Sequence, residues 1–411
     1  MSVEIVEKAE LGSLISPQRN QYIPIHNWYT FKHGFSRDLA LKIVANFNLS
    51  EGSWVLDPFC GSGTTLLTCK ELGINSRGFD ILPFSVFLSN VKIGDYDDAE
   101  LARQLELLKG DLNNYCIKTT LPDIPLVNKA FQPDVKNELL ILRHKIEKIR
   151  DPIIRSFFNL AFLGILESVS NTSKSGGFLR IIERDVSAHT VQSLFFSTVT
   201  SMVNDVALYN KRRERKNVSS IAKIGDARKL PTHRKYDAVI TSPPYPNRHD
   251  YTRIYSLEMI FDFVSSNDEL KKIRYETIRS HVEARKKYGA KGYKKPVILD
   301  TLITEVKKNG TNNPQVICML EGYFEDMYLS LSGIHRCLKP KGKVGMVISN
   351  VRFAGVNIVV DEILSEIGSQ VGLTPKEIWA VRYRGNSSQQ MRDYQRKPSR
   401  ESIIVWEKNA N

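Results

Sequence analysis

Short apolar runs bounded by turn residues alternate along the chain with segments of helical periodicity. Before the first run, Ser36 is a typical helix N-cap, and Leu39, Ile43 and Phe47 follow it at helical spacing. Strands that alternate with helices indicate an open, largely parallel α/β sheet, and the last two strands are close enough in sequence to pair as an antiparallel hairpin. Seven apolar runs predict strands, at residues 54–57, 76–79, 221–224, 236–240, 344–349, 378–383 and 403–406.

The stretch from residue 91 to 218 departs from this alternation. Its apolar residues recur at helical spacing, and residues 157–166 are mostly apolar. We therefore expect a large helical insertion in an α/β domain whose sheet is built from residues 24–90 and 220–408.

The composition of the 411 residues is that of a globular protein with a basic surface. Apolar residues make up 42% and charged residues 25%, which argues against a disordered, collagen-like or coiled-coil architecture. The 58 Lys and Arg residues exceed the 45 Asp and Glu residues and give a net charge of +13. A surface of this sign attracts polyanions, so nucleic acid is the partner class that the charge favours.

Several classes of protein are disfavoured by features that the sequence lacks. The five cysteines include no Cys-x-x-Cys pair and no histidine at zinc-finger spacing, so neither a disulfide framework nor a metal site is expected. No apolar run reaches the roughly 18 residues of a spanning helix, and residues 1–13 lack the basic start and apolar core of a secretory signal. We therefore expect a cytoplasmic protein with no membrane partner.

A loop of small residues, DPFCGSGTT, joins the first predicted strand to a helix. Gly61 and Gly63 allow a sharp turn and a close approach of the backbone to a ligand. Asp57, and Asp80 at the end of the next strand, can accept hydrogen bonds from a cationic or hydroxylated cofactor. The loop lacks the third glycine of a dinucleotide fingerprint and the Gly-Lys-Ser/Thr ending of a P-loop, which disfavours a nicotinamide enzyme or an NTPase. Taken alone, the loop is also compatible with a simple tight turn.

A second motif, Ser242-Pro243-Pro244-Tyr245, follows the predicted strand 236–240. Two consecutive prolines remove two backbone donors, stiffen the chain and leave carbonyl oxygens free to point into a pocket. The hydroxyl of Ser242 and the ring of Tyr245 lie beside them in sequence. Together these groups could receive an amino group on a planar base, although a proline-stiffened strand end would also account for the motif on its own.

The two motifs together resemble those of the amino-methylating DNA methyltransferases that use S-adenosylmethionine, and the Ser-Pro-Pro-Tyr form looks like the cytosine-N4 branch of restriction-modification systems. The resemblance covers residues 24–90 and 220–408. It implies a Rossmann-like methyltransferase sheet, S-adenosylmethionine as cofactor, double-stranded DNA as substrate and a separately encoded restriction endonuclease as partner. It also implies that the sheet-forming parts are a cofactor half followed by a catalytic half.

The resemblance also assigns roles to residues. Asp57, Gly61 and Gly63 would hold the methionine end of the cofactor, and Asp80 the ribose hydroxyls. The segment Gly225-Asp226-Ala227 looks like the one whose acid receives the adenine amine, and FKHGFS resembles the segment that closes over the methionine end. The complete set of implied cofactor residues is Phe31, His33, Ser36, Asp57, Pro58, Phe59, Gly61, Gly63, Thr64, Asp80, Asp226 and Ala227.

The chemistry of an exocyclic amine suggests how the second motif would act. The lone pair is delocalised into the ring, so acceptors for both amine hydrogens are needed, and Ser242 and the Pro243 carbonyl are the candidates. Tyr245 would stack on a base flipped out of the duplex. Direct displacement needs no covalent intermediate, and Cys60 is expected to be a packed residue. Adenine-N6 methylation, RNA amino methylation and a silent DNA-binding module remain the alternatives.

Two basic segments are candidates for contact with DNA. Residues 271–295 carry ten Lys or Arg against two Glu, and residues 382–400 carry six against one Asp. Interleaved aromatic residues and glycines favour phosphate contact here, whereas we interpret a third basic run, 211–216, as a solvated face.

Either the insertion 91–218 or the segment 265–315 could read the target sequence. Because phosphate contact needs charge, we favour 265–315 with the loop 384–400, and interpret the insertion as a helical cap. Residues 248–251 are further candidates for the base pocket. The residues expected to contact DNA are Arg248, Lys286, Lys287, Lys291, Arg384, Arg392 and Arg396.

Overall fold

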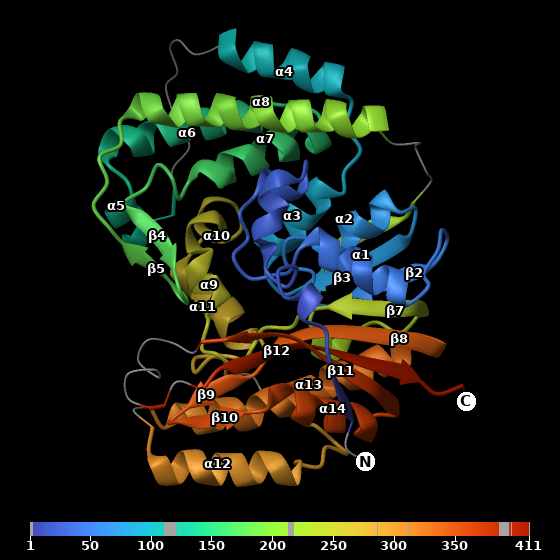
Figure 1. Ribbon diagram of the computed structural model, residues 1–411. Helices are drawn as coiled ribbons and strands as arrows, with labels where there is room; N and C mark the ends of the chain where they lie inside the picture. The colour runs from blue at the N-terminus through green and yellow to red at the C-terminus, as the bar shows by residue number, and fades with distance from the viewer. Residues whose placement is uncertain are drawn as a thin grey trace.

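A single mixed sheet forms the centre of the molecule (Figure 1). The computed structural model describes residues 3–110, 121–122, 124–212, 218–285, 287–311, 313–385, 394–395 and 397–410. Across these ranges the sheet has eight strands. In spatial order they are β1 (Glu4–Glu7), β11 (Leu373–Arg384), β12 (Ser399–Lys408), β8 (Leu338–Ser349), β7 (Tyr236–Thr241), β2 (Trp54–Asp57), β3 (Asn75–Asp80) and β6 (Ser220–Ile224). The strands from β8 to β6 in this order run parallel to one another, and β12 runs antiparallel to both of its neighbours, β11 and β8.

The predicted number of strands was one too low. Each of the seven predicted runs lies in a strand of this sheet, and β11 pairs with β12 in an antiparallel hairpin. The additional strand is β1, which pairs with β11 in parallel, Glu4 opposite Glu377. Its sequence EIVE has only two apolar residues, and three of its four side chains are exposed at the edge of the sheet. Such a strand has too little buried area to produce an apolar run.

Helices cover both faces of the sheet because side chains of the central strands alternate between the faces. Val55 points to the side covered by α1 (Arg37–Asn46), and Leu56 to the side covered by α13 (Gln315–Cys337). The other sheet-associated helices are α2 (Thr64–Glu71), α3 (Pro83–Lys92), α12 (Val297–Asn309) and α14 (Val360–Gln370).

The insertion forms a layer of helices at the top of Figure 1. Its apolar residues share one hydrophobic cluster with α3 and with α10 (Ser256–Asp262). Within this cluster the Phe162 ring lies 5.7 Å from that of Phe261 in α10. The insertion is not wholly helical, because an antiparallel ribbon of β4 (Thr172–Ser175) and β5 (Phe178–Ile181) turns at Gly176-Gly177. Its helices are α4 (Asp98–Gly110), α5 (Pro125–Ala130), α6 (Pro133–Glu147), α7 (Pro152–Ile165) and α8 (Ala188–Arg212).

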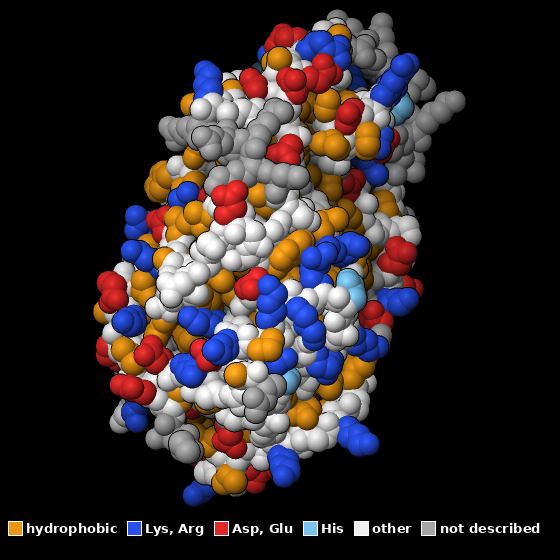
Figure 2. Space-filling view, turned by 90° about the vertical axis from the view of Figure 1, so that its right-hand side faces the viewer, with side chains coloured by type: hydrophobic (Ala, Val, Ile, Leu, Met, Phe, Trp, Pro, Cys, Tyr) orange, Lys and Arg blue, Asp and Glu red, His pale blue; other side chains and the backbone are white. Residues whose placement is uncertain are grey.

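The chain between β7 and β8 is mostly helical where it is described. It contains α9 (Tyr251–Ile254), α10 (Ser256–Asp262), α11 (Asn267–Glu276), α12 and α13, and a small ribbon, β9 (Val351–Phe353) and β10 (Val356–Ile358), follows β8. Figure 2 shows many Lys and Arg side chains near the middle of the face on which β2 lies in Figure 1. No helix in the described ranges is long and apolar enough to cross a bilayer.

Candidate active site

Two cavities meet at the carboxyl ends of the parallel strands, the edge at which open α/β sheets bind ligands. The smaller, called here the cofactor pocket, has an empty volume of about 720 Å³ and is bounded by the segments that follow β2, β3, β6 and β7. The larger is an open cleft that also reaches the β4–β5 ribbon and the β9–β10 ribbon. The residues common to both linings are Phe31, His33, Ser242, Tyr251 and His281.

The glycine loop after β2 has backbone angles that other residues adopt only with strain. Gly61 has a φ of +48° and Gly63 a φ of +75°. A Cβ atom on Gly63 would lie 2.9 Å from the Cα of Ser89, so α3 leaves no room for a side chain. The Gly61 N–H donates to Asp80 at 3.0 Å, which ties the loop to the end of β3.

Asp57 and Asp80, at the ends of β2 and β3, lie in different positions relative to the pocket. Asp57 lies beneath the loop, where it accepts hydrogen bonds from the Phe59 N–H at 3.1 Å and the Thr241 hydroxyl at 2.6 Å, and it does not line the pocket. Asp80 does line it. Burial raises the pKa of each carboxyl to about 6, although the hydrogen bonds that each accepts act in the opposite direction. Asp57 thus joins the cofactor loop to the strand that carries the second motif, and Asp80 faces the pocket.

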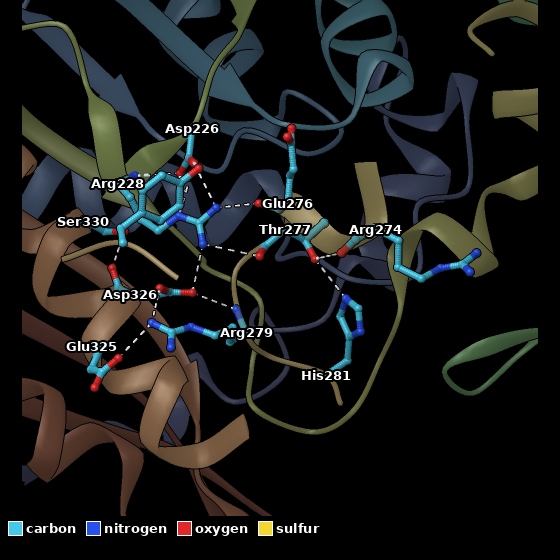
Figure 3. Close-up of polar contacts among 11 residues, drawn as sticks. Asp226, Arg228, Arg274, Glu276, Thr277, Arg279, His281, Glu325, Asp326 and Ser330 are labelled. Carbon is cyan, nitrogen blue, oxygen red and sulfur yellow. Dashed lines mark hydrogen bonds and ion pairs between the residues drawn. The ribbon is translucent and has the colours of Figure 1, made fainter. Parts of the chain in front are cut away.

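The carboxylate of Asp226 has little remaining capacity to accept hydrogen bonds from a ligand. Its carboxylate accepts from the Arg228 N–H at 2.9 Å, from the Arg228 guanidinium at 2.8 Å and from the Tyr288 hydroxyl at 3.1 Å (Figure 3). Burial opposes ionisation, but the hydrogen bonds and charge of Arg228 outweigh it and lower the pKa of Asp226. The structure therefore places Asp226 as a support of the pocket wall that it forms with Gly225 and Ala227.

The residues of the second motif are distributed between the two cavities. Pro244 lines the cofactor pocket, Pro243 and Tyr245 line the cleft, and Ser242 lines both. Burial raises the pKa of Tyr245 to about 12, so its phenol is neutral at physiological pH.

The segment that precedes α1 contributes two side chains to the junction of the cavities. The Phe31 ring stacks on Tyr255 with 4.7 Å between centroids. Burial, with smaller contributions from His249 and Lys32, lowers the pKa of His33 to about 3, and its buried Nδ1 has no hydrogen-bond partner among the described residues. Ser36 reaches neither cavity, because its hydroxyl caps α1 and donates to the Leu14 carbonyl at 2.7 Å.

In total, eight of the twelve expected cofactor residues line the pocket: Phe31, His33, Pro58, Phe59, Gly61, Asp80, Asp226 and Ala227. Besides Asp57 and Ser36, Gly63 and Thr64 lie outside the lining. Thr64 is the first residue of α2, and its hydroxyl lies 3.3 Å from that of Ser62.

One wall of the pocket comes from residues 277–281, which sequence reasoning did not place there. Arg279 fixes this segment, because its N–H and its guanidinium both donate to the buried Asp326 on α13, at 2.9 Å and 2.7 Å (Figure 3). His281 shares a 2.9 Å hydrogen bond with Thr277, while its buried Nδ1 has no hydrogen-bond partner in the part of the chain that the structure describes. No local motif marks the segment, since only its packing against α13 brings it to the pocket.

Two of the residues expected to contact DNA line the cleft. Arg248 and Arg384 are exposed there, and Arg248 has a φ of +72° in the loop after the second motif. Lys287 and Lys291 are exposed but line neither cavity. Lys286, Arg392 and Arg396 lie outside the described residues.

The chemistry of the pocket fits the cofactor that the resemblance implies. Asp80 offers a carboxyl to hydroxyl groups, Ile81, Leu82 and Ile278 provide apolar walls for a planar ring, and Gly61 allows a close approach of the backbone. Among the described residues no group of three His, Cys, Asp or Glu side chains is placed to hold a metal ion.

Comparison with known proteins gives the same family over nearly the whole chain. A family model described as DNA methylase matches residues 16–89. Type II methyltransferase M.BsoBI of Geobacillus stearothermophilus is 32% identical over 99% of this chain and 90% of its own length. Type II methyltransferase M.AvaI of Nostoc sp. is 28% identical over 96% of this chain and 89% of its own, and Type II methyltransferase M.MvaI of Kocuria varians is 24% identical over 76% and 73%. The protein belongs to the Type II DNA methyltransferases of restriction-modification systems, and S-adenosylmethionine is its cofactor.

Proposed function

We propose that the enzyme methylates the exocyclic N4 amine of a cytosine that is flipped out of double-stranded DNA. The observation that carries the proposal is the position of Ser242, the first residue of the Ser-Pro-Pro-Tyr motif, in the wall common to the cofactor pocket and the cleft. A group at that junction can touch a base that enters from the cleft while the methyl donor occupies the pocket.

The motif residues prepare the amine for displacement. The Ser242 hydroxyl and the Pro243 carbonyl accept the two amine hydrogens, which draws the nitrogen lone pair out of conjugation with the ring. The ring of Tyr245, in the cleft wall, stacks on the base and fixes its orientation. S-adenosylmethionine supplies an electrophilic methyl group on a sulfonium sulfur. With the cofactor bound, the new N–C bond would form as the S–C bond breaks, the thioether would be the leaving group, and the proton released by the amine would pass to solvent in the open cleft.

Direct displacement agrees with the state of the cysteine in the cofactor loop. Burial raises the pKa of the Cys60 thiol, and only 4% of this residue is exposed. A protonated, buried thiol is a poor nucleophile. Cys60 therefore acts as a packing residue beneath the loop, where the Ser89 hydroxyl lies 3.7 Å from its sulfur.

Different residues of the pocket contact different parts of the cofactor. Asp80 accepts from the ribose hydroxyls, the wall that Asp226 supports receives the adenine, and Gly61, Phe31 and His33 border the methionine end. Asp57 and Gly63 act indirectly, by holding the loop in shape.

DNA would lie in the cleft between two parts of the chain. The β4–β5 ribbon of the insertion borders it at Gly176 to Phe178, and the segment 265–315 borders it through Gly310 and Thr311. Their position at the cleft supports contact of both regions with the duplex, with Arg248 and Arg384 facing phosphates. In this proposal the insertion takes a direct part in DNA binding in addition to acting as a cap.

Methyl transfer to duplex DNA tests the proposal. The enzyme is incubated with plasmid DNA of varied sequence and methyl-labelled S-adenosylmethionine, and the digested nucleosides are identified by mass spectrometry. We expect labelled N4-methylcytosine, and no label with the Ser242→Ala variant. Labelled N6-methyladenine would show that the target base is adenine and not cytosine. Label that appeared only when RNA was the substrate would show that DNA is not the substrate.

A further inference from the structure

A large apolar side chain is exposed at the tip of the β4–β5 ribbon. The Phe178 residue is 54% exposed and lines the cleft. It directly follows a two-residue turn whose first residue, Gly176, has a φ of +62°, as tight hairpin turns of this length require. The turn therefore presents Phe178 at the far end of the ribbon.

The tip of this ribbon rests on the loop that follows the Ser-Pro-Pro-Tyr motif. A Cβ atom on Gly177 would lie 2.8 Å from the Cδ2 of His249 and 3.2 Å from its Cα, so the two backbones are in close contact. The Gly177 carbonyl also accepts from the Asp250 N–H at 3.4 Å. Phe178 thus lies beside the loop that follows the motif, and it lines the same cleft as Tyr245.

The ribbon is anchored by a buried ionic group at Lys174, one residue pair below its tip. The Lys174 ammonium donates to Glu258 at 2.5 Å and to the Tyr29 hydroxyl at 2.7 Å, and the Lys174 and Glu258 side chains are almost fully buried. Leu179, next to Phe178, packs against the main cluster of the insertion. An anchored ribbon keeps its exposed phenylalanine in a fixed position over the cleft.

We propose that Phe178 inserts into the DNA base stack at the position that the target base leaves. This inference rests on the proposed function. Removal of one base from a stack leaves an apolar gap, and a flat hydrocarbon side chain fills such a gap, as apolar wedges do in proteins that unstack base steps. Phe178 stabilises the flipped state, and Arg248 faces the phosphates beside it.

The test compares two duplexes that carry the site methylated by the wild-type enzyme. In one the target base has its normal partner, and in the other it lies opposite an abasic position, which lowers the cost of flipping. With Phe178→Ala, we expect the methylation rate on the paired duplex to fall at least about tenfold. On the abasic duplex the variant and the wild type should agree within about twofold, because flipping there no longer needs the wedge.

Matched variants separate the wedge from other effects. Ile181→Ala removes a side chain of the same ribbon that is 49% exposed but lines neither cavity, and it should leave both rates unchanged. Phe178→Trp keeps a flat apolar group and should restore the paired-duplex rate. An unchanged rate for Phe178→Ala, or an equal loss on both duplexes, would overturn the wedge while leaving the methyltransferase intact. Label from the wild type on a position other than the N4 amine of a cytosine would overturn the proposed function, whatever the result for Phe178→Ala.

Discussion

The Ser242 hydroxyl lies 3.4 Å from the hydroxyl of Tyr245, toward which it donates. A serine that donates its only hydrogen in this direction keeps its lone pairs free to accept a hydrogen from the target amine. In the proposed mechanism this contact orients the acceptor of the amine hydrogen, and the tyrosine has two functions, one for its ring and one for its hydroxyl.

Substitutions at these two positions should separate the two functions. Ser242→Ala should lower kcat by about 10²-fold or more through loss of an acceptor, and Tyr245→Ala should abolish transfer. Tyr245→Phe keeps the stacking ring and should retain far more activity than Tyr245→Ala. Calorimetry should find the affinity for S-adenosylmethionine nearly unchanged in all three. Full activity of both alanine variants would disprove the catalytic assignment.

Cofactor affinity should depend on pH through Asp80. Burial raises the pKa of this carboxyl to about 6, and the ionised form is the better acceptor for ribose hydroxyls. As pH falls through 6, Asp80 becomes protonated, and the dissociation constant of S-adenosylmethionine should rise by up to about tenfold per pH unit. Titrations between pH 5 and 8 measure this slope. Asp80→Asn should bind weakly at every pH and lose the slope, whereas a slope that survives in this variant belongs to another group.

The sequence predicted those parts of the site that local motifs form. The glycine loop, Asp80 and Ser242 lie at strand ends, so a strand and its following residues were enough to place them. Residues 277–281 could not be placed, because they reach the pocket only through the contact of Arg279 with a helix that comes later in the chain. The sequence likewise does not reveal that Arg228 occupies the carboxylate of Asp226.

Gly63 should tolerate alanine less well than a glycine of similar conformation elsewhere. Gly63 and Gly52 have φ values of +75° and +83°, but only at Gly63 would a Cβ meet backbone, at 2.9 Å from the Ser89 Cα. Gly52→Ala should cost about 1–2 kcal/mol from the backbone conformation alone. Gly63→Ala should lower the free energy of unfolding further and weaken cofactor binding. Urea unfolding and calorimetry of both variants measure this, and equal stability of the two would contradict the steric explanation.

The ion group around Asp326 should support both the fold and the cofactor pocket. Asp326 is fully buried and accepts from Arg228 at 3.0 Å and Arg279 at 2.7 Å. Asp326→Asn removes the counter-charge that two buried guanidinium groups share and leaves each with one carboxylate partner, Asp226 or Glu325. We expect a loss of up to about 3–5 kcal/mol in the free energy of unfolding. The substitution should also weaken cofactor binding, because Arg279 no longer holds residues 277–281.

Glu325 provides the control for this prediction. It pairs with the same Arg279 at 3.0 Å, but its side chain is 39% exposed. Glu325→Gln should therefore cost less than about 1 kcal/mol and leave cofactor binding unchanged. Both variants are compared by urea unfolding, and equal losses would show that burial does not set the strength of these pairs.

The salt dependence of DNA binding should identify the cations that touch phosphates. Each phosphate contact releases counterions, so removing one such contact lowers the slope of log Kd against log salt concentration by about one. Arg248→Ala and Arg384→Ala should show this decrease, because both side chains line the cleft. Lys287→Ala and Lys291→Ala remove equal charge from exposed positions outside the two cavities, and should leave the slope unchanged. A reduced slope for the lysine variants alone would show that DNA binds at the surface of the segment 265–315 and not in the cleft.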